Sequence, residues 1–171
     1  MTDAVNEPTQ PGASTRSASE APSSEPLSAT APTTPATAST TPAELTRAKV
    51  GLRITHRRYV PYGHAHYAGN LVDGAYSMAA FGDVATEMCI VTDGDEGLFA
   101  SYSDVQFCSR ITAGDVIEIS AEIIRVGTRS REMDFEVRVV GRGNQERGES
   151  AAEMLDPPIV ATTARGVVVV P

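Results

Sequence analysis

The stretch that decides the fold, HAHYAGNLVDGAYSMAAFGDVATE, runs from His64 to Glu87 and changes the period of the sequence. Before it, apolar and polar residues alternate over 48–59, which predicts a strand that 61–63 (PYG) breaks. From about Asn70 to Ile90, small or apolar residues recur every three or four positions, which predicts one long helix. The members of this face are Leu71, Ala75, Met78, Gly82, Ala85 and Cys89. Because a mid-helix glycine costs about 1 kcal/mol relative to alanine, Gly74 and Gly82 suggest that another backbone packs closely there.

After the helix the chain has the pattern of an antiparallel sheet. Strands are expected over 97–108, 115–126, 131–140 and 161–170, with a loop over 141–158 that contains a short helical turn at 150–155. One strand, one long helix and a run of strands form an α+β pattern. We therefore expect a hot-dog fold, in which a curved antiparallel sheet is wrapped around one central helix.

The composition divides the chain into a tail and one domain. Residues 1–43 are rich in Pro, Ser, Thr and Ala and are expected to be disordered, either as a solubilising tail or as a docking segment. They contain four acidic residues and one arginine, which does not fit a secretory signal or an Arg-rich transit peptide. Residues 44–171 are long enough for one domain with its own core.

Charge and cysteine content narrow the function classes. The chain has 22 acidic and 14 basic residues, so nucleic acid is not an expected partner. No apolar run is long enough to cross a bilayer. Cys89 and Cys108 have no CxxC spacing, which favours a reduced, cytoplasmic protein. The acidic segment 93–96 lacks the later glutamate of a calcium loop, so we interpret it as a turn and expect no metal.

The other face of the predicted helix carries two carboxylates. At 100° per residue, Asp73, Tyr76, Ala80, Asp83 and Glu87 form one stripe. Asp83 and Glu87 lie one turn apart, and the helix has no Lys or Arg to neutralise them. This stripe is either a solvated face or the wall of a pocket that holds a cation.

The entry to the helix has the character of a binding site. Gly69 and Asn70 precede backbone N–H groups that lack intrahelical partners, and such groups bind anions and developing oxyanions. His64, His66 and Tyr67 lie on the loop that leads to this point. His66 is either structural or functional, and Asp73 is expected to cap the helix.

Several separated motifs occur in family-like order, and together they carry a resemblance. They are AHYAGNLVDGA (65–75), FGDVATE (81–87), DGDEGLF (93–99), SREMDFE (130–136), SAA (150–152) and PIV (158–160). On these motifs, residues 48–171 resemble the 3-aminobutyryl-CoA and β-alanyl-CoA ammonia-lyase family of hot-dog enzymes. The chain departs from the family pattern at Glu132, where a basic residue is expected, and at Met88 and Cys89, which replace leucines.

The resemblance implies reversible elimination of ammonia from a 3-aminoacyl-CoA to give a 2-enoyl-CoA. Such a reaction needs a base for the α-proton, donors for the thioester enolate and a place for the amine. The candidates are Asp83 or Glu87 as the base, with the other carboxylate holding the substrate ammonium. Tyr67, Gly69 and Asn70 would bind the substrate and its oxyanion. His66 would either relay a proton or donate to the thioester oxygen.

The coenzyme A part of the substrate needs a phosphate site. Arg129, Ser130 and Arg131 form the best local pattern for one, although a solvated strand edge explains them equally well. No cofactor is expected besides the coenzyme A of the substrate. The fold predicts a homodimer or a larger assembly, up to a hexamer. The alternatives are a hot-dog acyl-CoA thioesterase, an enoyl-CoA hydratase, or a binding protein that has lost the chemistry.

Overall fold

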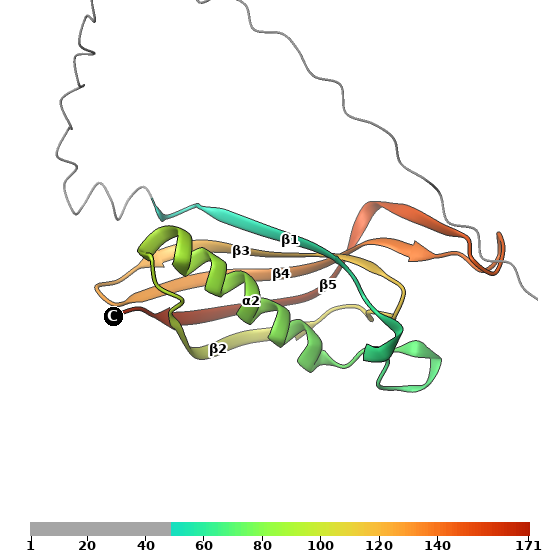
Figure 1. Cartoon of the computed structure of the whole chain (residues 1–171), viewed down its shortest axis with the longest axis horizontal. Coiled ribbons are helices and arrows are strands. Elements are labelled where there is room, and N and C mark those ends of the chain that lie inside the picture. Colours follow the sequence, from blue (N-terminus) through green and yellow to red (C-terminus); the bar gives the residue numbers. More distant parts are fainter. Residues whose placement is uncertain (1–48) are drawn as a thin grey trace, which may run out of the picture. The chain divides into compact units, whose positions relative to one another are not determined.

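The computed structural model describes residues 49–171, and the predicted tail of residues 1–43 lies outside them. Five strands form one antiparallel sheet in the order β1-β3-β4-β5-β2, so β1 and β2 are its edges. One long helix, α2, lies across one face of the curved sheet (Figure 1). The expected hot-dog fold is confirmed. The elements are β1 (Arg53–Tyr59), η1 (Tyr62–His64), η2 (Ala68–Asn70), α2 (Gly74–Asp93), β2 (Leu98–Phe107), β3 (Val116–Val126), β4 (Ser130–Gly143) and β5 (Ala152–Val169).

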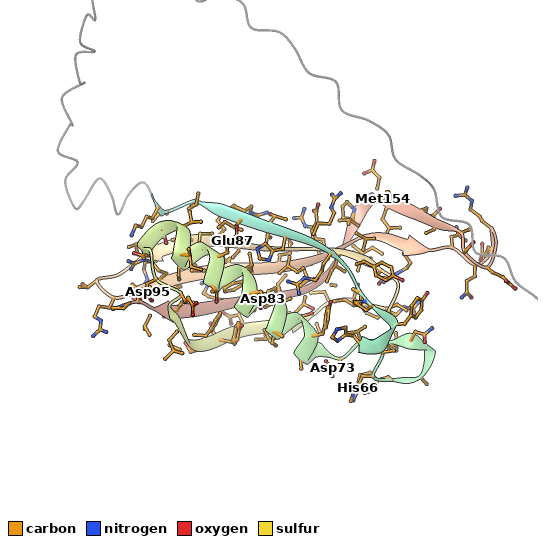
Figure 2. The ribbon with its side chains drawn as sticks, in the orientation of Figure 1. His66, Asp73, Asp83, Glu87, Asp95 and Met154 are labelled. Carbon is orange, nitrogen blue, oxygen red and sulfur yellow. The ribbon has the colours of Figure 1, made fainter. Side chains whose placement is uncertain are left out.

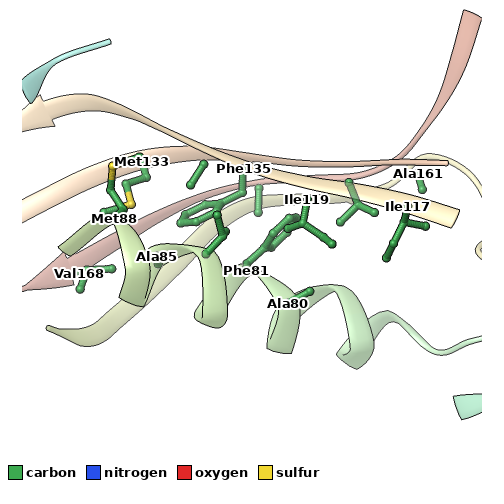
Figure 3. Packing of buried hydrophobic residues seen from close by; sticks show 14 of the residues in the cluster. Ala80, Phe81, Ala85, Met88, Ile117, Ile119, Met133, Phe135, Ala161 and Val168 are labelled. Atoms are coloured by element: carbon green, nitrogen blue, oxygen red, sulfur yellow. The ribbon is translucent and has the colours of Figure 1, made fainter. Parts of the chain in front are cut away.

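The core lies between α2 and the inner face of the sheet (Figure 3). The helix buries Ser77, Ala80, Phe81, Val84, Ala85, Met88 and Cys89. These pack against sheet residues that include Ile117, Ile119, Met133, Phe135, Ala161 and Val168. Of the face predicted from the sequence, only Ala85 and Cys89 are fully buried, and Ala80 belongs to the core rather than to the carboxylate stripe. Phe81, Val84 and Met88 set the buried face because burying large side chains removes more apolar area from water.

The helix begins four residues later than expected and ends later too. The Asp73 side chain accepts a hydrogen bond of 3.0 Å from the Tyr76 N–H, which makes Asp73 the N-cap, as predicted. Gly94 ends the helix with a left-handed φ of 70°. The sheet covers only one side of α2, so Ala79, Asp83, Glu87 and Ile90 on the other side are exposed.

The structure differs most from the sequence prediction in the segment between the last two predicted strands. Instead of a loop with a helical turn at 150–155, β4 and β5 continue as a long hairpin arm that extends beyond the end of the sheet (Figure 1). The ladder pairs Gly141 with Met154 and Gly143 with Ala152. The pairing of β4 with β5 shifts register between Val139 and Gly141, and Pro157 and Pro158 of β5 lie at this irregularity.

Candidate active site

Two cavities lie at the N-terminal end of α2. The first, of about 490 Å³, is called the helix-end cavity; its lining includes Tyr67, Asp73, Gly74, Ser77, Phe107, Arg110 and Thr162. The second, of about 540 Å³, is called the loop cavity; its lining includes Gly69, Asn70, Arg110, Asp115, Arg142 and Asn144. Arg110 lines both, so the two cavities adjoin. Together they form the candidate site.

The first turn of α2 supplies hydrogen-bond donors to the helix-end cavity. The Asp73 cap satisfies the Tyr76 N–H, whereas the first N–H groups of a helix, here those of Gly74 and Ala75, have no intrahelical acceptor. They also lie at the positive end of the helix dipole. The Phe107 ring packs directly against Gly74, where a Cβ atom would be 2.5 Å from Phe107 Cε1. Only glycine lets the ring approach this closely without a shift.

Gly69 and Asn70 lie in the turn before the helix rather than at its N-terminus. Both have left-handed backbones, with φ of 73° and 60°, and the Asn70 carbonyl accepts from the Ala113 N–H at 2.8 Å. They line the loop cavity. The expectation that the free helix N–H groups lie near Asn70 is therefore wrong, because Asp73 starts the helix at Gly74. The corresponding donors are those of Gly74 and Ala75.

His66 lies beside Asp73 at the helix N-terminus (Figure 2), and Tyr67 packs against His66. The two rings meet edge to face with centroids 4.5 Å apart. His66 Nδ1 is 3.7 Å from Asp73 Oδ2, and Tyr67 lines the helix-end cavity. His64 packs instead on Tyr76, at 4.9 Å between centroids. The structure thus brings His66, Tyr67 and Asp73 together at the start of α2, with Tyr67 and Asp73 in the lining of the helix-end cavity and His66 beside it.

Asp83 and Glu87 lie farther along α2, outside both cavities (Figure 2). Arg58 Nη2 of β1 donates to Asp83 Oδ2 at 3.1 Å, and His56 of the same strand pairs with Glu87. The side chains are 60% and 51% exposed. At 1.5 Å per residue, Asp83 is about 13 Å from Gly74 along the helix axis. As the sequence shows, α2 itself offers these carboxylates no Lys or Arg; their partners, Arg58 and His56, come from β1.

The predicted phosphate site, Arg129 to Arg131, lies at the opposite end of the domain. Arg131 is 5% exposed, and its Nε donates to Asp93 Oδ2 at 2.9 Å. Its Nη1 donates to the Gly127 and Ser130 carbonyls, and Arg129 Nε donates to the Val170 carbonyl. Asp93 is the last residue of α2, whose 20 residues span about 30 Å. Within one protomer, this turn cannot join the site at the helix N-terminus, and Arg131 holds the helix end instead.

An ionic cluster closes the C-terminal end of α2. Asp93 accepts from Arg131, from Lys49 Nζ at 2.6 Å and from Thr92 Oγ1 at 2.7 Å. Partial burial on its own would raise the pKa of Asp93, but these bonds outweigh it and hold the pKa well below its usual range. Asp95 Oδ1 accepts from the Gly97 N–H at 2.8 Å, which confirms that the acidic segment is a turn. No cluster of three or more His, Cys, Asp or Glu residues suited to a metal is found in residues 49–171.

The structure adds site residues that sequence reasoning missed. Ser77, Phe107, Arg110 and Thr162 converge on the helix-end cavity from α2, β2, the segment after β2, and β5. Arg110 forms no ion pair with any carboxylate in the described part of the chain. The basic residue at the end of a predicted strand was the only available signal for Arg110, and nothing local marked Thr162.

Comparison with known proteins first defines the class. Residues 69–144 match the model of the Thioesterase superfamily. The fold also resembles a hexameric hotdog fold thioesterase of Campylobacter jejuni, with a TM-score of 0.56 and 18% identity over 67% of this chain and 79% of that one. An identity this low shows the fold alone. Together with the fold, this partial match defines the class of protein as a hot-dog domain.

Two closer similarities define the family. The chain is 49% identical over 107 residues to a 3-aminobutyryl-CoA ammonia lyase of Acetoanaerobium sticklandii. The aligned residues make up 63% of this chain and 85% of the relative. It also matches the structure of a β-alanyl-CoA:ammonia lyase from Clostridium propionicum, with a TM-score of 0.67 and 33% identity over 71% of this chain and 86% of that one. The chain belongs to the family of 3-aminobutyryl-CoA and β-alanyl-CoA ammonia lyases. The family resemblance predicted from the motifs is confirmed.

Proposed function

We propose that this protein is a carbon–nitrogen lyase that reversibly eliminates ammonia from a 3-aminoacyl-CoA, either 3-aminobutyryl-CoA or β-alanyl-CoA, to give a 2-enoyl-CoA. The observation that carries the proposal is the 49% identity over 85% of a relative named for this reaction. The reaction needs no cofactor besides the coenzyme A of the substrate.

The helix-end cavity suits the thioester. We place the thioester oxygen on the free N–H groups of Gly74 and Ala75, where the helix dipole stabilises the enolate that forms when the α-proton leaves. The Phe107 and Tyr67 rings flank the acyl group and limit its contact with water. Arg110, without a carboxylate partner in residues 49–171, is the candidate contact for the coenzyme A phosphates in place of Arg131.

Proton transfer is assigned to His66. Its imidazole lies 3.7 Å from the Asp73 carboxylate, which would stabilise the imidazolium formed by taking the α-proton. Asp83 and Glu87, the bases expected from the sequence, would act only if a second copy of the chain placed its helix at this cavity. His66→Gln is expected to abolish turnover, whereas Asp83→Asn is expected to leave most of it. The reverse result would return the role of base to Asp83.

The assembly completes the site in this proposal. β2 is an edge strand with unpaired backbone groups, and it exposes Leu98 by 72% and Phe107 by 61%. Because unpaired edges of this kind pair with another chain, we propose a homodimer joined along β2, with a hexamer as the larger assembly. Phe107 belongs both to this edge and to the helix-end cavity, so pairing along β2 would cover the cavity mouth. A monomer in light scattering at micromolar concentration would contradict the assembly.

Location and other partners follow from composition. We propose a cytoplasmic enzyme that does not bind nucleic acid, in line with its net charge of −8 and its two free cysteines. None of the helices in residues 49–171 is both long and apolar enough to span a membrane.

The proposed function is tested in the direction of elimination. The purified protein is incubated separately with 3-aminobutyryl-CoA and β-alanyl-CoA, while the enoyl thioester, free ammonia and free thiol are measured together. The proposal expects equal amounts of enoyl thioester and ammonia without thiol. Thiol release would instead identify a thioesterase, and binding without any turnover would identify a binding protein. Elimination of water from 3-hydroxybutyryl-CoA alone would identify a hydratase.

A further inference from the structure

A buried pair of hydroxyl groups lies on the wall of the helix-end cavity. Ser77 Oγ, in the first turns of α2, is 3.0 Å from Thr162 Oγ1 of β5. Their residues are only 1% and 2% exposed, yet both line the cavity. The pair is therefore a buried part of the cavity lining, whereas Tyr67 and Phe107 in the same lining are exposed.

The pair has hydrogen-bonding capacity that the protein does not use. Each hydroxyl has one donor and two lone pairs, and the bond between Ser77 and Thr162 uses one donor and one lone pair. One O–H and three lone pairs remain, and neither oxygen has another hydrogen bond within residues 49–171. Because a buried donor without an acceptor is unfavourable, a small polar molecule is expected to occupy this position.

We propose that the Ser77–Thr162 pair binds ammonia, both as it leaves the substrate and as it adds to the enoyl thioester; this inference rests on the proposed function. Ammonia has one lone pair and three N–H groups, which matches the one donor and three lone pairs that the hydroxyl pair leaves free. Water has two of each and therefore matches less well. The nearby helix N-terminus disfavours the positive charge of the substrate ammonium, and this favours the neutral ammonia that forms when the C–N bond breaks.

The position fits the geometry of the substrate. Ser77 follows Gly74 by three residues, so its hydroxyl lies roughly one helical turn from the N–H groups assigned to the thioester oxygen. The carbon that bears the nitrogen is two bonds from the carbonyl carbon. A substrate with its oxygen on the helix N-terminus can therefore direct its nitrogen toward the hydroxyl pair.

The elimination of ammonia needs only His66 and the hydroxyl pair to move and receive its groups. His66 takes the α-proton, the electrons of that C–H bond form the C=C bond, and the C–N bond breaks with its electron pair leaving on nitrogen. The leaving group of the ammonium substrate is thus neutral ammonia, which the hydroxyl pair receives. Ammonia then takes the proton from the His66 imidazolium and leaves as ammonium, which restores neutral His66.

A purely structural role for the pair, joining α2 to β5, makes a different prediction. Losing a structural bond would lower stability and affect all kinetic constants together. Losing an ammonia site would raise the KM for ammonium while leaving the KM for the thioester unchanged. The addition of ammonium to crotonyl-CoA separates the two roles, because the two substrates are varied independently.

The test uses the full chain and four variants. Ser77→Ala and Thr162→Val remove one hydroxyl each, and Thr162→Ser keeps the hydroxyl while removing a methyl group. Thr163→Val is the matched control, because Thr163 is the next residue of β5 and faces the other side of the sheet. We expect Ser77→Ala and Thr162→Val to raise the KM for ammonium about tenfold or more, with the KM for crotonyl-CoA and the control both unchanged.

Thr162→Ser is expected to restore the KM for ammonium close to that of the wild type. The inference is overturned if the two KM values rise together, if neither changes, or if Thr162→Ser behaves like Thr162→Val. If Ser77→Ala fails to fold, the comparison of Thr162→Val with Thr162→Ser still shows whether the hydroxyl group is needed to bind ammonia. If the wild-type protein adds no ammonia at all, the proposed function itself fails. If the wild type adds ammonia and Thr162→Val has an unchanged KM for ammonium, only the hydroxyl site is refuted.

Discussion

The contact between Gly74 and Phe107 predicts a variant that loses activity without losing stability. In Gly74→Ala, the new Cβ would be 2.5 Å from Phe107 Cε1, whereas carbon atoms normally approach to about 3.5–4.0 Å. The ring must therefore withdraw by about 1 Å. Within one protomer it can do so at little cost because Phe107 is 61% exposed there. Alanine also favours the helix over glycine by up to about 1 kcal/mol, so we expect the free energy of unfolding to be unchanged or slightly raised.

Activity is expected to fall because Phe107 and Gly74 form the wall around the thioester. A displacement of about 1 Å at a reacting group can reduce the rate about 100-fold, so we expect kcat/KM for crotonyl-CoA to fall about 10- to 100-fold. Gly82→Ala is the matched control on the same helix, since within residues 49–171 nothing but the adjoining residues and backbone of the helix itself lies within 4 Å of the added Cβ. Steady-state kinetics and thermal unfolding of both variants check the prediction. Wild-type activity in Gly74→Ala, or an equal loss in Gly82→Ala, would refute the reasoning.

Three further predictions concern other parts of the domain. Asp93→Asn should lower the free energy of unfolding by about 3 kcal/mol at neutral pH, because it leaves Arg131 buried without its carboxylate. Folding lowers the pKa of Asp93, so the difference in free energy of unfolding between the wild type and Asp93→Asn should be complete above about pH 4 and should shrink as the pH falls further. Denaturant titrations at several pH values measure this difference. Iodoacetamide should modify exposed Cys108 in the native protein but spare Cys89, because burial and the nearby Asp93 raise the pKa of Cys89 to about 11. Peptide mass spectrometry shows which cysteine is modified, and modification of Cys89 before Cys108 would contradict the prediction. Arg110→Gln should raise the KM for crotonyl-CoA several-fold, by loss of a charge-assisted bond, while leaving the KM for ammonium unchanged; equal rises in both would exclude a specific coenzyme A contact.

The fold was predictable because it follows from local periodicity. The change from alternating residues to three- and four-residue spacing located α2, and alternation located the strands of the sheet. The start of the helix was missed because small residues continue the helical spacing upstream of the Asp73 cap. The hairpin arm was missed because residues 141–158 are polar and contain prolines, and only pairing between β4 and β5 keeps them extended.

The site was less predictable because its residues come from distant parts of the sequence. Tyr67 was expected near the pocket because a few residues join it to the helix, and it lines the helix-end cavity, with His66 beside Asp73. The partners of Asp83 and Glu87 were not predictable, because Arg58 and His56 are on β1 and meet the helix only through the fold. The guanidinium group of Arg131 suits a phosphate contact, and its structural role becomes visible only from its burial against Asp93.

The central claim is that this domain transfers ammonia to and from a CoA thioester, and one incubation tests it most directly. The purified protein is mixed with crotonyl-CoA and ammonium, the acyl-CoA products are weighed by mass spectrometry, and a thiol reagent reports free coenzyme A in parallel. We predict a product heavier by one ammonia, with no release of thiol. Release of thiol, or a water adduct alone, would contradict the account and show that the hot-dog fold carries a different reaction here.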